Sequence, residues 1–258
     1  MRINHNIASY NAHRLMSQNT TNASKSMEKL SSGLRINRAA DDAAGLSISE
    51  KMRGQIRSME QAQKNAQDGI SLIQTAEGAL NEVSDMLVRI KELYTQDANG
   101  TYNASDKANI AAEIAALTAE IDNIATNTKF NEITLLDNSL SISIQINHTS
   151  SDTMDVVMGT SIASTSIPTS DLDETTDAID AVSSIRSTFG ALQNRLEHTV
   201  NNLGTTAENL TAAESRIRDT DMAKEMMNFT KNNILNQASQ AMLAQANQQP
   251  QGVLQLLR

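Results

Sequence analysis

The sequence contains no cysteine and no tryptophan, and it has only three phenylalanines, three tyrosines, two prolines and ten glycines. Without cysteine the chain forms no disulfide, no thiolate nucleophile and no Cys-ligated metal site. Aromatic side chains usually dominate the burial energy of a globular core, so a core here must use Ile, Leu, Val, Ala and Met where helices meet. Since few helix-breaking residues interrupt the chain, these absences favour an elongated helical bundle.

Long apolar runs are also missing. No stretch approaches the ~20 apolar residues that a membrane-spanning helix needs. Residues 1–16 contain no apolar run of signal-peptide length. We therefore expect no membrane insertion, and we expect that a secreted form would use a route other than cleavage of a secretory signal.

The net charge of −9 is unevenly distributed. Residues 1–57 carry nine Lys or Arg and four Asp or Glu, whereas residues 97–185 carry two and fourteen. One interpretation is a solvated acidic surface with some basic helix faces. The other is an acidic region that faces water and a basic end that packs against acidic neighbours. Neither indicates nucleic-acid binding, because the basic end lacks interleaved aromatic residues and the whole chain is acidic.

Apolar residues recur at alternating steps of three and four in three segments, as in coiled coils. They are Ile73, Ala76, Leu80, Val83, Leu87, Ile90 and Tyr94, then Ile110, Ile114, Leu117, Ile121 and Ile124, and then a run from Val182 to Ile217. The spacing predicts long helices. One of them, from about residue 45 to 96, would be ~75 Å long at 1.5 Å per residue.

Turn chemistry predicts where these helices end. Residues 31–33, Ser-Ser-Gly, interrupt the first helix, and Asp41 and Asp42 are candidate caps for the next. Asn99 and Gly100 separate the second helix from the third, which Ser105 and Asp106 could cap.

The middle of the chain changes its period from helical to alternating. Leu140, Ile142, Ile144 and Ile146 alternate with polar residues, and a second short apolar segment covers residues 154–158. This pattern predicts a β-hairpin at about 140–158. Residues 159–178 are rich in Ser, Thr and Asp and are expected to form a loop. The predicted fold is therefore mainly α, an elongated coiled-coil helical bundle with one β-hairpin.

The two ends of the chain are predicted to associate. Residues 1–32 are rich in the poor helix formers Asn, Ser and Thr, so this helix is marginal alone. Its sparse apolar positions, at 4-3-4 spacing, can be buried only against another helix, and the C-terminal segment offers a complementary surface. We assign a role in subunit assembly to Ala23, Met27, Leu30 and Leu34, and to Met222, Met226, Phe229, Leu235, Met242 and Leu243. The pattern alone also fits an ordinary intramolecular helix pair.

Catalytic sites are not indicated. His5, His13, His148 and His198 are scattered and form no zinc-binding HExxH motif, and there is no Gly-rich phosphate loop. The adjacent carboxylates Asp41 and Asp42 do not face each other on a helix, so a capping role is favoured. We expect no catalytic, cofactor-binding or metal-binding residues, and no cofactor.

The motif LSSGLRINRAADDAAGLSIS at residues 30–49 resembles the N-terminal signature of bacterial flagellin. The resemblance continues through residues 65–80 and 128–131, and it ends with residues 216–223 and 250–258. It covers nearly the whole chain outside residues 140–175. Several long motifs in the same order make this resemblance specific.

The resemblance implies a structural subunit that self-assembles into the helical flagellar filament used for bacterial motility, a secreted protein that leaves through type III export. In flagellins the terminal helices pair into an inner coiled coil, here residues 1–44 with 219–258, and a helical core with the hairpin covers 45–218. The segment between hairpin and last helix is too short for large outer domains. The implied partners are further copies, an export chaperone at about residues 219–258, and hook-associated and cap proteins.

One surface patch is predicted from helix geometry. The stripe through Leu87, Ile90 and Tyr94 leaves Arg89 and Leu93 off the core face. Glu113 likewise lies off its own stripe. A solvated helix face explains this arrangement as well. The resemblance implies contact of Arg89, Leu93 and Glu113 with host Toll-like receptor 5, although Tyr94 after the Leu departs from the commoner pattern.

Two alternatives from other classes stay open at this point. The hook–filament junction protein shares the terminal organisation, but it typically has Pro after the paired Asp, where this chain has Ala43. A coiled-coil adaptor would not need the apolar C-terminal residues 253–257. An enzyme is the least favoured class, since no site is indicated.

Overall fold

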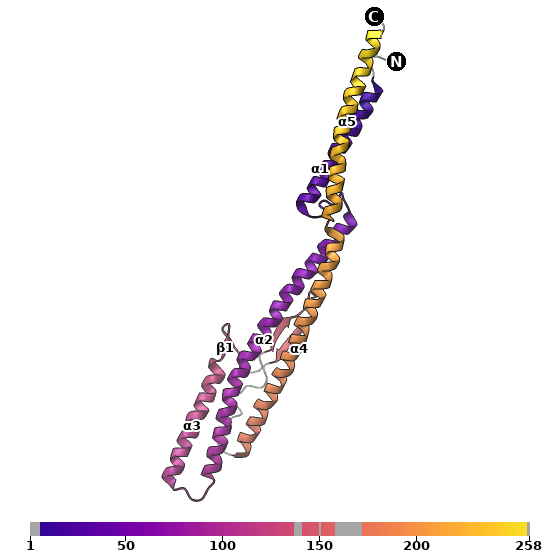
Figure 1. The fold of residues 1–258 in the computed structure, drawn as a ribbon. Coiled ribbons are helices and arrows are strands. Elements are labelled where there is room, and N and C mark those ends of the chain that lie inside the picture. The colour runs from indigo at the N-terminus through magenta and orange to yellow at the C-terminus, as the bar shows by residue number, and fades with distance from the viewer. Residues whose placement is uncertain (1–5, 137–140, 150, 158–171, 257–258) are drawn as a thin grey trace. The chain divides into compact units, whose positions relative to one another are not determined.

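A computed structural model describes residues 6–136, 141–149, 151–157 and 172–256. Most of these residues are helical, as predicted (Figure 1). The helices are α1 (Ile7–Ser32), α2 (Ala43–Asp97), α3 (Ala104–Asn127), α4 (Leu172–Arg218) and α5 (Met222–Leu256). The strands are β1 (Lys129–Phe130), β2 (Ile133–Thr134), β3 (Ser141–Gln145) and β4 (Thr153–Val157).

Residue contacts divide the chain into two compact units. Unit 1 comprises residues 1–54 and 209–258, and unit 2 comprises residues 55–208. Unit 1 therefore contains α1, α5 and one end each of α2 and α4. Unit 2 contains the remainder of α2 and α4, together with α3 and all four strands.

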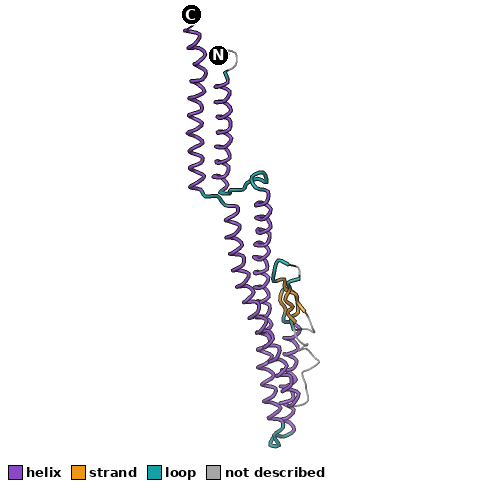
Figure 2. The backbone as a smooth tube through the Cα atoms, turned by 90° about the vertical axis from the view of Figure 1, so that its right-hand side faces the viewer, coloured by secondary structure: helices purple, strands orange, loops and turns teal. Residues whose placement is uncertain are grey.

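Unit 2 has a continuous apolar core, which α2, α3 and α4 build side by side (Figures 1 and 2). The heptad positions form this core, as predicted. Ile73, Leu80, Leu87 and Ile121 are fully buried, and α4 contributes Phe189, among others. The spacing of three and four thus places one face of each helix against its neighbours.

The predicted hairpin is confirmed in the antiparallel pair β3–β4, with Ile144 opposite Met154. The apolar side chains of the pair alternate inward, so that Ile144, Met154 and Val156 are buried. The hairpin packs on α2, where the Asn65 side-chain amide donates to the Gln145 carbonyl at 3.2 Å. Gly69 leaves the space that the end of Ile144 occupies. The outer predicted positions, Leu140 and Met158, lie outside the described residues.

A second, shorter hairpin, β1–β2, was not predicted. Lys129 pairs with Thr134 and Phe130 with Ile133, around the two-residue turn of Asn131 and Glu132. Both turn residues have positive φ, 48° and 67°, as a type I′ turn requires. The sequence signal is weak because Glu132 stands where such a turn usually has glycine.

The helix ends follow the predicted turn chemistry in part. α1 ends at Gly33, whose φ of 73° is the left-handed conformation that glycine adopts without steric cost. The Asp42 carboxylate accepts from the Gly45 N–H at 2.9 Å at the start of α2, as predicted. The Asp41 carboxylate instead accepts from the N–H groups of Asn37 and Arg38 in the preceding turn.

The start of α3 differs from the prediction. Asn103, not Ser105, is the N-cap, and its side chain accepts from the N–H groups of Ser105 and Asp106 at 2.8 Å. Asp106 in turn accepts from the Asn103 N–H at 3.3 Å. This reciprocal pair is a capping box, which satisfies N–H groups that a helix start leaves without partners.

The start of α4 is also earlier than expected. The predicted loop at residues 159–178 is wrong for residues 172–178, because α4 begins at Leu172 and buries Thr175 and Ala178. Asp173 and Glu174 in its first turn interact favourably with the helix dipole. Residues 158–171 lie outside the described part of the chain.

Candidate assembly site

In unit 1, α1 and α5 pack side by side as an antiparallel pair (Figure 1). Among the described residues, four hydrogen bonds join α1 and its N-cap to α5, all made by polar side chains. They are Asn6 to the Ala246 carbonyl (2.6 Å), Ser9 to Asn247 (2.9 Å), Asn19 to Ser239 (3.3 Å) and Thr20 to Asn236 (3.4 Å). Asn6, at the start of α1, bonds to Ala246 in the later part of α5, whereas Thr20, further along α1, bonds to the earlier Asn236. The two helices are therefore antiparallel.

The seam between the two helices is made mostly of small and polar residues at heptad spacing. On α1 the buried and half-buried positions include Ser9, Ala12, Met16, Asn19, Ala23, Ser26 and Leu30. On α5 they include Glu225, Phe229, Asn232, Asn236, Ser239, Leu243 and Ala246. Polar residues at such positions set the register of a coiled coil at a cost in stability. The pair is therefore specific without a strong apolar core.

The predicted assembly residues fall into two groups. Ala23 is buried, and Leu30, Phe229 and Leu243 are half-buried at the seam. Leu34 lies beyond the end of α1 and pairs with Asp219 as an isolated β-bridge. The second group is exposed on the outside of the pair and comprises Met27, Met222, Met226, Leu235 and Met242. The structure thus brings only the first group together within one chain.

The polar half of the seam was missed by sequence reasoning, which considered apolar residues only. The signal that could have found it is the same 3-4 spacing, extended to Ala, Ser and Asn. Asn19, Ala23 and Ser26 on α1 keep this spacing, as do Asn232, Asn236 and Ser239 on α5.

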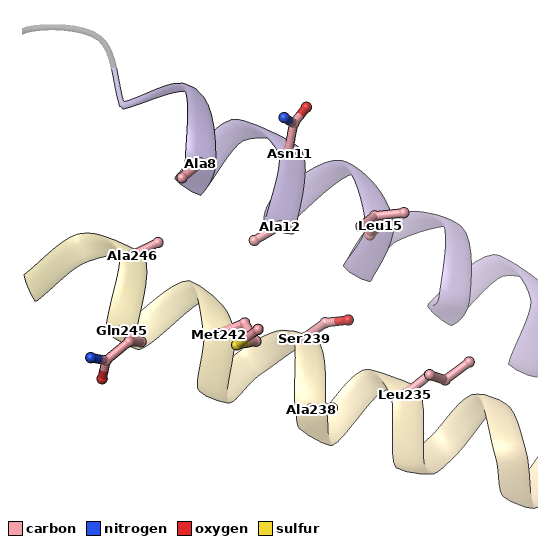
Figure 3. A pocket seen from close by; sticks show the side chains of 10 residues that line it. All are labelled: Ala8, Asn11, Ala12, Leu15, Leu235, Ala238, Ser239, Met242, Gln245 and Ala246. Carbon is pink, nitrogen blue, oxygen red and sulfur yellow. The ribbon is translucent and has the colours of Figure 1, made fainter. Parts of the chain in front are cut away.

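A groove of about 470 Å³ lies along the outside of this pair (Figure 3). It is lined by Ala8, Asn11, Ala12, Leu15, Leu235, Ala238, Ser239, Met242, Gln245 and Ala246. Alanine and serine on its floor let the backbones approach, while Leu15, Leu235 and Met242 supply apolar walls. These two helices offer a concave apolar surface that their own side chains leave open.

At one end of the α1–α5 pair lies a junction, where the segment that follows α1 meets the segment that joins α4 to α5. The Arg35 N–H donates to the Arg218 carbonyl at 2.6 Å, and the Thr220 N–H donates to the Gly33 carbonyl at 3.0 Å. The Arg35 guanidinium donates two further bonds to the Ile217 carbonyl. These bonds satisfy backbone groups that the ends of α1 and α4 would otherwise leave unpaired.

An ion pair braces this junction. The Arg218 guanidinium, whose side chain is only 13% exposed, contacts the Glu50 carboxylate at 2.5 Å. The Arg218 hydrogen bond, aided by Arg53, holds the pKa of Glu50 below its ordinary value. The N–H groups of Arg38 and Asn37 lower the pKa of the Asp41 carboxyl in the same way. Both carboxylates therefore favour their charged forms.

The predicted receptor patch on unit 2 is only partly at the surface. Arg89 donates to Glu113 at 3.0 and 3.1 Å and to Glu92 at 3.1 Å. All three side chains are exposed, and the two carboxylates raise the pKa of Arg89. The prediction that Leu93 lies off the core face is wrong, because Leu93 is 2% exposed. Because α2 packs against both α3 and α4, its buried arc is wider than a single heptad stripe.

The described part of the chain shows neither a metal-binding cluster nor a membrane-spanning helix. No group of three or more His, Asp or Glu side chains lies close enough there to hold a metal ion. Within the same residues, no helix combines the length and the apolar character of a membrane span.

Comparisons with known proteins cover almost the whole chain. The family model described as bacterial flagellin N-terminal helical region matches residues 3–141, and that described as bacterial flagellin C-terminal helical region matches residues 172–257. A flagellin of Halalkalibacterium halodurans is 55% identical, and one of Bacillus subtilis is 52% identical, each over the full length of both chains. The crystal structure of Bacillus cereus flagellin is 36% identical with a TM-score of 0.49, covering 58% of this chain and 94% of that one.

Proposed function

The chain belongs to the bacterial flagellin family, and on that premise we propose that its α1–α5 pair is the element through which subunits assemble. The chain is a structural subunit that self-assembles into the extracellular flagellar filament. The family consists of structural proteins, and we expect no catalytic activity. What the membership leaves open is which residues of this chain join the copies.

Exposed apolar residues support the assignment to α1 and α5. On α5 the exposed fraction is 51% for Met226, 59% for Ile234 and 67% for Met242. α1 exposes Ile7, Leu15 and Met27. Several large apolar side chains exposed on one helix pair support an interaction surface there. Further copies of the chain would cover it in the filament.

The polar seam supports a second part of the proposal, that the ends become fully ordered only on assembly. Asn and Ser at seam positions contribute little burial energy, and helices rich in them are marginal alone. We therefore assign residues 1–44 and 219–258 to an inner coiled-coil domain, and residues 45–218 to a core that folds first. Such ends would pass through a type III export channel unfolded and pair at the growing filament.

Truncation tests the role of the ends. Deletion of residues 1–40 or of residues 219–258 should leave a soluble helical core that cannot polymerise, because the unit 2 core remains intact. Sedimentation after salt seeding and electron microscopy measure the outcome. Filaments formed by either truncated chain would refute the proposal.

Point variants test the exposed face more sharply, since they keep both helices. The double variant Leu235→Gln with Met242→Gln places two amides on the α5 side of the groove (Figure 3). It should retain the helical content of the subunit and lose filament formation. The matched control is Val157→Gln, an exposed apolar residue of unit 2 at 54%, which should still polymerise. Equal polymerisation of the double variant and the control would argue against this face.

Before export, α5 is also the proposed binding site of a flagellar chaperone, at about residues 219–258. Its exposed methionines, Met222, Met226 and Met227, form a flexible apolar surface suited to such a partner. Calorimetric titration of the chaperone should show binding to the full chain and none to a chain ending at residue 218. Undiminished binding by the truncated chain would place the site elsewhere. Hook-associated and cap proteins are proposed partners of the same ends.

Recognition by host Toll-like receptor 5 is proposed through Arg89 and Glu113, whose ion pair faces solvent. Leu93 is left out because it is buried. Replacing both surface residues with alanine should reduce reporter-cell signalling, while the nearby Lys91→Ala should not. Unchanged signalling by the double variant would remove this role.

A further inference from the structure

The loop between α2 and α3 contains Asn99 followed by Gly100, the single Asn-Gly pair of the sequence. Assembly does not explain these residues. Both are exposed, and no side chain packs over the loop at Gly100, where an added Cβ would meet nothing within 4 Å. An asparagine before glycine is chemically labile when the glycine nitrogen can reach the side-chain carbonyl carbon, because glycine allows close backbone approach.

A hydrogen bond in the loop orients the Asn99 side chain toward the residues that follow it. The Asn99 side-chain oxygen accepts from the Thr101 N–H at 3.3 Å, which folds the side chain forward over the intervening Gly100 amide. The Gly100 N–H donates no hydrogen bond within the described part of the chain. The nucleophilic nitrogen is therefore unengaged, and the hydrogen bond to Thr101 restrains the Asn99 side chain that carries its target.

We propose that Asn99 is a site of spontaneous deamidation in the folded subunit. The deprotonated Gly100 nitrogen attacks Cγ of Asn99, so that an N–Cγ bond forms and the Cγ–Nδ2 bond breaks. Nitrogen Nδ2 leaves as ammonia and takes up the proton. Water then opens the resulting succinimide at Cγ, which gives aspartate, or at the backbone carbonyl, which gives isoaspartate.

The product changes the loop in two ways. A new carboxylate appears close in sequence to Asp97 and Asp106, in a unit that already has twenty-two Asp or Glu against eight Lys or Arg. Isoaspartate also adds one methylene to the backbone between α2 and α3. Helix α3 keeps its N-cap, because Asn103 and Asp106 form the capping box independently of residue 99.

Asp68 and Gly69 form a second pair that could react through a succinimide, and this pair serves as a control for Asn99 and Gly100 in the same chain. These residues lie within α2, and Gly69 is buried beneath Ile144 and Leu196. The helix holds the Gly69 nitrogen in its own hydrogen bond and away from the Asp68 carboxyl. We expect this pair to react only when the chain is unfolded.

The test incubates the full-length subunit at neutral and mildly alkaline pH, followed by peptide mass mapping and by labelling with a protein isoaspartyl methyltransferase. Aspartate and isoaspartate should accumulate at position 99 and faster at higher pH, while Asp68 stays unchanged. Gly100→Ala, which fits the loop without a contact, should slow the reaction on the order of tenfold because its Cβ hinders the approach of the nitrogen.

Two outcomes would overturn the proposal. If Asn99 persists in the folded subunit but reacts in urea, the native loop protects it. If the Gly100→Ala variant reacts as fast as the original chain, with unchanged circular dichroism, the reaction does not pass through the Gly100 nitrogen.

Discussion

The two units of this chain use the same heptad spacing with opposite side-chain chemistry. In unit 2 the repeated positions carry Ile, Leu, Val and Phe, and they form one continuous buried core. In unit 1 the repeated positions carry mostly Ala, Ser and Asn, and Ile36 is the only large apolar side chain of its described residues that is fully buried. The heptad spacing therefore determines that the helices pair, whereas the side chains at the heptad positions determine how stable the pairing is.

The difference separates folding from assembly. Full burial of a large apolar side chain contributes roughly 1.5 to 3 kcal/mol, whereas a hydrogen bond contributes about 0.5 to 1.5 kcal/mol net. A unit built on the first term can fold alone. We expect a unit built mainly on hydrogen bonds to stay marginal until other copies of the chain cover its exposed methionines and leucines, as proposed above.

The largest expected effect is on the free energy of unfolding, and it is tested by replacing one apolar residue of each unit with alanine. Phe189→Ala in the unit 2 core should lower the free energy of unfolding by about 3 to 5 kcal/mol, through lost burial and a cavity. Met242→Ala on the surface of unit 1 should change it by less than about 0.5 kcal/mol. Urea unfolding followed by circular dichroism measures both. Similar losses in the two variants would contradict the contrast between the units.

A smaller effect, of opposite sign, should follow from making the unit 1 seam apolar. Asn236 is half-buried there and accepts a long bond, 3.4 Å, from the exposed Thr20 hydroxyl. Asn236→Leu should stabilise the α1–α5 pair by roughly 1 to 2 kcal/mol through added burial. Hydrogen exchange of the α1 amides in the unassembled subunit should slow accordingly. Leu at the exposed neighbour, Gln237→Leu, is the control and should leave exchange unchanged.

The sequence predicted unit 2 better than unit 1 for a physical reason. Apolar residues such as Ile73 and Leu80 report burial directly, so their spacing identifies helices and core together. Small and polar residues such as Asn19 and Ser26 occur at seams and at surfaces alike, and the α1–α5 seam was therefore recognised only in part. Helix pairing at the ends was predictable, but its chemistry was not.

Two of the local errors, at Leu93 and at residues 172–178, have a similar origin. Leu93 was placed outside the core because a single stripe was assumed, whereas the buried arc of a helix depends on how many partners it has. Residues 172–178 were assigned to a loop from their Ser, Thr and Asp content. Tertiary burial of Thr175 and Ala178 outweighs that local preference.

The smallest expected effect is a loss of stability at the junction of unit 1 when the pH is lowered. Because the folded chain holds the pKa of Glu50 below its ordinary value of 4.5, the contribution of this group to stability is complete above pH 4.5. It is lost as the pH falls through the lowered folded value. Asp41 acts in the same direction below its ordinary value of 3.8. Unit 1 should therefore loosen on acidification before the apolar core of unit 2, which holds no ionisable group among its buried residues.

Glu50→Gln isolates this effect, since it removes the titrating group and keeps a side chain of similar size. Hydrogen exchange at the α1 and α5 amides should show a smaller change in protection between pH 5 and pH 3 in the variant than in the original chain. Glu60→Gln, an exposed glutamate of α2 that joins no ion pair among the described residues, should keep the full change. If both variants respond to acid as the original chain does, the Arg218–Glu50 pair does not brace the junction, and the marginal stability of unit 1 rests on its polar seam alone.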